Sequence, residues 1–185
     1  MKMFIGQRLN ARSIFKEFLV CVLQVCDPDE VLISSGFYSN EFWNCDPRLI
    51  SLLRNKNITL SGQQQYIRRL NAELATVLGP SSNVTSQILP LLPSDPAWHK
   101  NEIHFIKDDK TIAIIMGSSS CTARDLDQDF TDPTKPPYNI NTDILICSDS
   151  NAEDIGNNLR EMDIPIPQVN ILDSLTATTK RQIGI

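Results

Sequence analysis

Apolar residues recur at helical spacing in four parts of the chain, and each part ends at a residue that disfavours a helix. At the second of these an Asp46–Pro47 pair supplies a capping side chain and a first-turn proline, which is a typical helix start. At the fourth, Ser150 and Glu153 have the spacing of a capping box. The predicted helices cover residues 13–26, 46–53, 61–78 and 150–162.

Short apolar runs between these helices predict strands. Two of them enclose the polar segment 107–110, which contains no Gly, so we expect a four-residue turn there rather than the tightest hairpin. Because strands alternate with helices, we expect a single-domain α/β fold with a mixed, mainly parallel sheet flanked by helices. We place this domain at residues 1–165 and a C-terminal tail at residues 166–185. The other predicted strands lie at residues 30–36, 57–60, 87–92 and 141–147.

Composition narrows the class of protein. The 185 residues suffice for one domain, and the net charge of −5 means that any nucleic-acid contact must come from a local patch. No apolar run approaches the roughly 20 residues that cross a bilayer, and charged residues interrupt the N-terminal run, so we expect neither a membrane segment nor a secretory signal. Five Cys without a paired spacing predict reduced, buried thiols and a cytoplasmic protein.

The sequence contains no convincing motif for a metal or cofactor site. The acidic run that begins at Asp125 lacks the Gly and the terminal Glu of a calcium loop, because Phe130 and Pro136 stand in those places. Two His and scattered Cys do not match a zinc site. We therefore expect no metal and no cofactor.

The most specific pattern in the chain lies in residues 99–124. The two strands around the polar turn are followed by a Gly-Ser-rich stretch that we expect to enter a helix. This layout resembles the site of the phospholipase D superfamily, in which an HxKxxxxD motif precedes GSxN. Asp109, Gly117 and Ser118 match the motif, whereas Glu102 stands at the His position and His104 at the Lys position. Ser120 replaces the final Asn.

The resemblance extends to two further segments. Residues 31–39 resemble the first strand of the family, which often ends in a Ser-Gly-aromatic-aromatic-Ser run, and Asn141-Thr-Asp143 resembles a later Asn-x-Glu element. It implies the fold of the family's nuclease and restriction-endonuclease-like branch over residues 10–163. Family members use two copies of the motif, and this chain has no internal repeat. The resemblance therefore implies a homodimer with two apposed sites.

We expect six residues to form the site. Residues two apart on a strand face the same side, so Glu102 and His104 should lie together. A backbone anion site at the following helix is possible, although an ordinary serine cap is the commoner arrangement. We expect His104 and Arg124 to contact phosphate. Ser118 and Ser120 should donate hydrogen bonds, and Glu102 and Asp109 should orient cations or the imidazole.

The departures from the motif argue against hydrolysis. A carboxylate at position 102 repels a phosphodiester instead of attacking it, and His104 carries less positive charge at pH 7 than the Lys it replaces. We therefore expect a domain that binds a phosphodiester, with DNA as the expected nucleic acid, and has a degenerate, inactive motif. Two alternatives remain open: a metal-independent nuclease that uses His104, and a protein–protein interaction module.

Two simpler interpretations also remain open. Glu102 and His104 could be an exposed pair on an edge strand with no ligand. Five basic residues on or near two predicted helices could be solvated faces or one DNA-facing patch. These are Arg48, Arg54, Lys56, Arg68 and Arg69.

Overall fold

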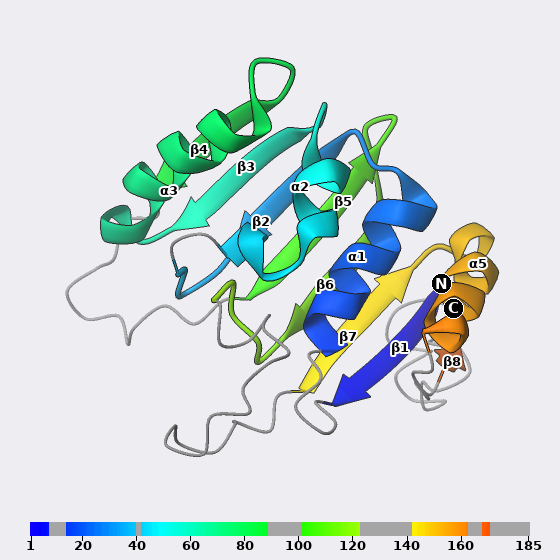
Figure 1. The fold of residues 1–185 in the computed structure, drawn as a ribbon. Helices are drawn as coiled ribbons and strands as arrows, with labels where there is room; N and C mark the ends of the chain where they lie inside the picture. Colours follow the sequence, from blue (N-terminus) through cyan, green and yellow to red (C-terminus); the bar gives the residue numbers. More distant parts are fainter. Residues whose placement is uncertain (8–13, 40–41, 89–100, 123–141, 163–167, 171–185) are drawn as a thin grey trace.

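The computed structural model describes residues 1–7, 14–39, 42–88, 101–122, 142–162 and 168–170. Its centre is an eight-stranded sheet in the order β4-β3-β2-β5-β6-β7-β1-β8 (Figure 1). The strands are β1 Lys2–Gln7, β2 Glu30–Ser34, β3 Asn57–Gly62, β4 Asn83–Ile88, β5 Glu102–Lys107, β6 Lys110–Gly117, β7 Thr142–Cys147 and β8 Gln168–Asn170.

The described helices form one layer. α1 packs against α2 and α5, and α2 packs against α3. Figure 1 shows α1 and α2 in front of the central strands. The fold is therefore a mixed α/β domain with helices on one face of the described sheet. The helices are α1 Ile14–Cys26, the 3₁₀ turn η1 Phe42–Cys45, α2 Pro47–Leu53, α3 Gln64–Leu78 and α5 Asp149–Glu161.

The expectation of a mainly parallel sheet is wrong. Only β2, β3 and β4 run parallel, and each of these two pairs is joined through a helix, as a parallel connection requires. The other five neighbouring pairs are antiparallel. A strand–helix–strand order usually gives a parallel pair, and it predicted the pairing of β2, β3 and β4. The β5–β6 hairpin has no helix between its strands, and β1 is inserted between β7 and β8, so these strands pair antiparallel.

The strands at both edges of the sheet, β4 at one edge and β1 with β8 at the other, also differ from the expectation. β4 starts at Asn83, four residues before the predicted strand. β1 and β8 were not predicted, and β8 pairs with β1 inside the segment for which we expect a tail. Most of that segment lies outside the described residues, so the division into domain and tail stays a prediction.

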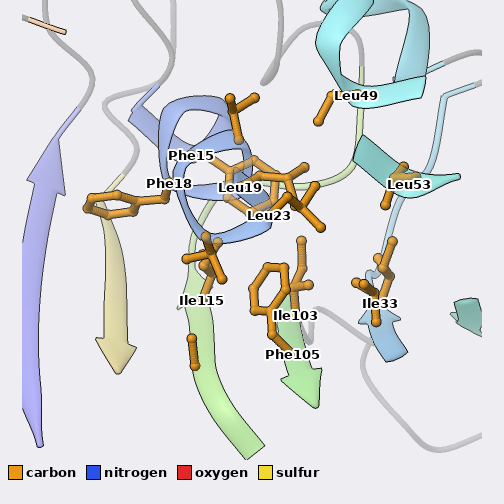
Figure 2. Packing of buried hydrophobic residues seen from close by; sticks show 14 of the residues in the cluster. Phe15, Phe18, Leu19, Leu23, Ile33, Leu49, Leu53, Ile103, Phe105 and Ile115 are labelled. Carbon is orange, nitrogen blue, oxygen red and sulfur yellow. The ribbon is translucent and has the colours of Figure 1, made fainter. Parts of the chain in front are cut away.

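The core lies between α1 and the sheet. Phe15, Phe18, Leu19 and Leu23 of α1 lie over the central strands, with Phe105 of β5 below them (Figure 2). α1 is buried around most of its circumference because the sheet lies below it and α2 and α5 lie beside it. α1 therefore packs on the sheet and supports the motif strands β5 and β6 from one face.

Two charged residues of α1 are buried together with the start of α2. Asp46 caps α2 by accepting from the Arg48 backbone N–H at 2.9 Å, as the sequence predicts. Its carboxylate also binds the Arg48 guanidinium at 2.6 Å and lies 3.7 Å from Lys16 Nζ. Arg48 reaches Glu17 at 3.4 Å. These four residues form one ion network, which we call the α1–α2 network.

Four of the five cysteines are free and buried: Cys21, Cys26, Cys121 and Cys147. Burial raises the pKa of Cys21 and Cys147 to about 12 and that of Cys26 to about 11. These thiols are therefore protonated packing groups at neutral pH. No described helix is both long and apolar enough to span a bilayer.

The hairpin between β5 and β6 is tighter than predicted. Lys107 pairs with Lys110, so the loop has only two residues, Asp108 and Asp109, and both have positive φ angles of 49° and 58°. This is the backbone of a type I′ turn. Asp tolerates the left-handed region better than most residues, which is why the turn forms without Gly.

We expect the pair of substitutions Asp108→Asn and Asp109→Gly to stabilise the fold by about 0.5–1 kcal/mol, because Asn-Gly suits a type I′ turn best. The measurement is the urea midpoint of unfolding. Asp109→Val is the opposing variant and should lower the midpoint, since a β-branched side chain strains a positive φ. An unchanged midpoint in both variants would contradict this assignment of the turn.

Candidate functional site

Strand β5 brings Glu102 and His104 together on the face of the sheet opposite the helices. Ile103 and Phe105 alternate with them and point into the core beneath α1 (Figure 2). His104 Nε2 lies 3.2 Å from Glu102 Oε2, and the two side chains are 32% and 26% exposed. The pair is therefore within reach of a ligand. We call it the Glu102–His104 pair.

The neighbouring strands surround this pair with mainly apolar side chains. In the register of the sheet His104 lies between Leu32 of β2 and Ile114 of β6. Glu102 lies between Ser34 and Met116 in the same way. All four neighbours are partly exposed. A carboxylate and an imidazole in such surroundings can hold one polar group of a ligand whose remaining surface is apolar or planar.

Residues 118–122 are not helical, and the helix that we expect to follow the Gly-Ser-rich stretch lies outside the described residues. Their backbone N–H groups are used inside the protein. Ser118 N donates to Thr142 O at 3.1 Å, Ser119 N to Asp143 Oδ1 at 3.1 Å, and Cys121 N to Ser35 Oγ at 3.2 Å. These amides do not form the predicted helix-terminal anion site.

Ser119 and Asp143 form a buried contact that the sequence did not indicate. Ser119 Oγ donates to Asp143 Oδ2 at 2.6 Å, and both residues are 2% exposed. Asp143 alternates with Thr142 and Ile144 and lies on the helix side of the sheet together with Leu145. Asp143, which matches the Asn-x-Glu element of the resemblance, is therefore not on the face that carries the Glu102–His104 pair.

The end of β2 is tied to both motif strands. Ser35 Oγ lies 3.0 Å from Asn101 Oδ1, and the Gly36 N–H donates to the same oxygen at 3.3 Å. Tyr38 forms an isolated parallel bridge with Cys121. Its hydroxyl lies 2.9 Å from two strand carbonyls, and burial raises its pKa. This run, which resembles the family's Ser-Gly-aromatic segment, acts here as a structural link.

Phe37, next in this run, is a candidate binding residue that the sequence analysis missed. Its side chain is 39% exposed although the neighbouring Tyr38 is buried. The Phe37 ring packs edge-on against Tyr66, with centroids 6.3 Å apart. The link through Asn101 places Phe37 at the same sheet end as Glu102. An aromatic residue after a Ser-Gly turn was the available signal.

The remaining predicted site residues differ in their surroundings. Ser118 is exposed and its Oγ accepts from Thr142 N at 2.9 Å, whereas Ser120 is 8% exposed. Asp109 lies in the hairpin turn, at the end of β5 opposite to Glu102. Arg124 lies outside the described residues.

Three of the five basic residues pair with carboxylates, whereas Arg54 and Arg68 are exposed. Arg48 belongs to the α1–α2 network, and Lys56 is buried with its Nζ 2.7 Å from Asp27 Oδ1. Arg69 pairs with Glu73 one turn further along α3. These pairs lower the positive charge available to a polyanion. The described residues also contain no group of three or more His, Cys, Asp or Glu that could hold a metal ion.

Comparisons with known proteins give structural likenesses at low identity. No protein-family model matches the sequence, and no curated protein matches it. Polyphosphate kinase from Porphyromonas gingivalis is 11% identical with a TM-score of 0.47, over 89% of this chain and 26% of that one. NucT from Helicobacter pylori is 10% identical with a TM-score of 0.47, over 87% of this chain and 96% of that one.

A third similar structure is TrmBL2, an archaeal chromatin protein whose structure shows a novel mode of DNA binding. It is 12% identical with a TM-score of 0.41, over 88% of this chain and 52% of that chain. The chain thus spans about a quarter of the polyphosphate kinase and about half of TrmBL2. At these values the likenesses establish neither a family nor a function for this chain.

Proposed function

We propose that the chain is a phospholipase D-like domain that binds a phosphodiester, with single-stranded DNA as the ligand, and that its motif no longer supports hydrolysis. The Glu102–His104 pair is the observation that carries this proposal. It occupies the motif strand, shares one face and is partly exposed. Because His104 Nε2 lies 3.2 Å from Glu102 Oε2, Glu102 orients the ring through Nε2, and Nδ1 is the nitrogen that donates to a phosphate oxygen.

The absence of hydrolysis follows from the chemistry of the pair. The family's reaction needs a nucleophilic imidazole and a Lys beside it, and here a carboxylate holds the first position. A carboxylate next to a phosphodiester raises the electrostatic free energy of the complex and does not neutralise the transferring oxygens. Ser120, at the position of the motif Asn, is nearly buried. These residues therefore argue against covalent catalysis.

Preference for a single strand rests on Phe37. An unpaired base can stack on an exposed aromatic ring, whereas bases within a duplex are already stacked. Phe37 lies at the sheet end where Glu102 begins β5 and packs on Tyr66 of the helix layer, so a strand with a phosphate on His104 would pass around this sheet end to place a base on Phe37. A homodimer with two such sites in one groove follows from the single motif copy and is part of this proposal.

We expect His104→Ala to weaken binding of a labelled single-stranded oligonucleotide by about tenfold, because it removes a charge-assisted hydrogen bond. Phe37→Ala should weaken it by a similar factor through lost stacking. The measurement is fluorescence anisotropy at about 50 mM salt and again at higher salt, where affinity should fall. Val77→Ala is the control, since Val77 is a comparably exposed apolar residue on α3.

Two outcomes would replace this proposal. Cleavage of plasmid DNA in EDTA that His104→Ala abolishes would identify an active nuclease. Failure to retain DNA or RNA even at low salt would favour a protein–protein interaction module. Retention in wild type with no effect of His104→Ala would leave DNA binding but remove the Glu102–His104 pair from it.

A further inference from the structure

Strand β4 is an edge of the described sheet and most of its side chains are exposed, although the Asn71 amide of α3, in the orientation that satisfies both of its ends, donates to the Val84 and Thr85 carbonyls. It pairs with β3 on one side and ends the strand order on the other. Five of its six residues are exposed, and Ile88, at 39%, is one of the four exposed large hydrophobic residues of the described chain. An open strand edge presents unpaired N–H and C=O groups that can accept another strand.

β4 also lacks the features with which proteins usually block an edge. Its sequence, Asn-Val-Thr-Ser-Gln-Ile, has no Lys or other charged residue and no Pro, and its register with β3 is uninterrupted from Asn83 to Ile88. Edge strands are normally protected by such charges, prolines or bulges. An uncharged strand can approach a second copy of itself without like-charge repulsion.

We propose that β4 is a self-association edge, where β4 of one molecule pairs antiparallel with β4 of a second copy to form a continuous sheet across a two-fold axis. The strand itself indicates the register. An axis perpendicular to the sheet keeps the helices of both copies on one face, so directly opposed residues must face the same side. Only residues whose numbers differ by an even number can then be opposed.

A register centred on Ser86 satisfies this condition and covers the apolar residues. It places Val84 opposite Ile88 of the second copy on the helix side. It places Thr85 opposite Gln87 on the other side, which is a polar pair. Val84 already packs against the edge of the core, so the apolar surface continues across the axis and covers the exposed Ile88.

This interface lies on a different part of the molecule from the apposed sites of the proposed function, and it would form through backbone pairing instead of through a ligand. The proposal does not depend on those sites. A pairing of five residues on each strand is small compared with the standard interface of about 1,600 Å². The association is therefore weak, and it is measured at protein concentrations on the order of 100 µM.

Cysteine cross-linking tests the register. Ser86→Cys should form an intermolecular disulfide under mild oxidation, because directly opposed Cα atoms lie about 4.5–5.5 Å apart, within disulfide reach. Thr85→Cys is the matched control. It faces position 87 of the second copy and should not cross-link alone, but should do so when mixed with Gln87→Cys. The read-out is non-reducing gel electrophoresis, with wild type treated in parallel.

Charge substitutions test the association itself. Thr85→Lys combined with Gln87→Lys places like charges opposite each other and should abolish the dimer in light scattering at about 100 µM. Mixing it with Thr85→Glu combined with Gln87→Glu should restore a mixed dimer. A monomeric wild type, or a dimer that the Lys variant leaves intact while Ser86→Cys fails to cross-link, would overturn the proposal. The second result would also separate it from a dimer formed through the sites.

Discussion

Asp46→Ala is expected to lower the free energy of unfolding by about 3–5 kcal/mol, the usual cost of removing one partner from a buried ion pair. Asp46 is 5% exposed and serves two purposes, as the cap of α2 and as the carboxylate that Arg48 and Lys16 share. Its loss leaves Lys16, 3% exposed, without that carboxylate. The measurement is a urea titration of wild type and variant at pH 7.

The same residue predicts a dependence on pH. Burial raises the pKa of Asp46, but hydrogen bonds from the Arg48 side chain and backbone outweigh it and hold the pKa below its ordinary value. A folded-state pKa below the unfolded one gives stability that is present above about pH 4 and lost as pH falls through the folded value. The difference in stability between wild type and Asp46→Ala should therefore be constant near neutrality and shrink in acid.

Asp149→Ala is the control for both measurements. Asp149 also lies at the start of a helix and pairs with the chain's N-terminal amine, but its side chain is 69% exposed. Its replacement should barely move the urea midpoint, because solvent screens exposed ion pairs. Equal effects of Asp46→Ala and Asp149→Ala would show that the α1–α2 network contributes no more than a surface pair.

The sequence predicted the parts of the fold in which a local pattern and the tertiary environment agree. α1 was predictable because its apolar stripe faces the sheet, and α2 because Asp46 caps it. Strand direction was not predictable, since β2 alternates between buried and partly exposed residues although it is parallel to β3 and antiparallel to β5. The position of the turn at residues 107–110 was predicted, but its tight two-residue loop was not, because both Asp108 and Asp109 adopt positive φ, for which Gly is the usual signal.

The candidate site was predictable to a similar extent. Alternation along β5 is enough to place Glu102 and His104 on one face, and they lie 3.2 Å apart. The contacts of Ser119 and Ser35 were not predicted, because their partners are distant in sequence. Ser119 binds Asp143, 24 residues away, and Ser35 accepts from Cys121 across 86 residues. A Gly-Ser run next to a strand has the same local pattern whether it caps a helix or links strands.

Gly117→Ala is expected to destabilise the fold by about 3 kcal/mol and to disrupt the segment that follows β6. A Cβ at position 117 would lie 2.3 Å from Asp143 Oδ1, 2.5 Å from Thr142 O and 2.7 Å from Asp143 Cα. Two of these three atoms belong to the backbone of β7, so no side-chain rotation relieves the contact. The Gly of the Gly-Ser pair is therefore needed for strand packing, whether or not a ligand binds.

The measurement combines urea unfolding with oligonucleotide binding. Ser118→Ala is the neighbouring control: it removes the Thr142 N–H to Ser118 Oγ hydrogen bond at an exposed position and should cost less than about 1 kcal/mol. If Gly117→Ala unfolds at the wild-type midpoint but loses binding, the Gly belongs to the ligand site and not to the packing of β6 on β7. Lower stability together with retained binding below the new midpoint is the result expected from the contacts with Thr142 and Asp143.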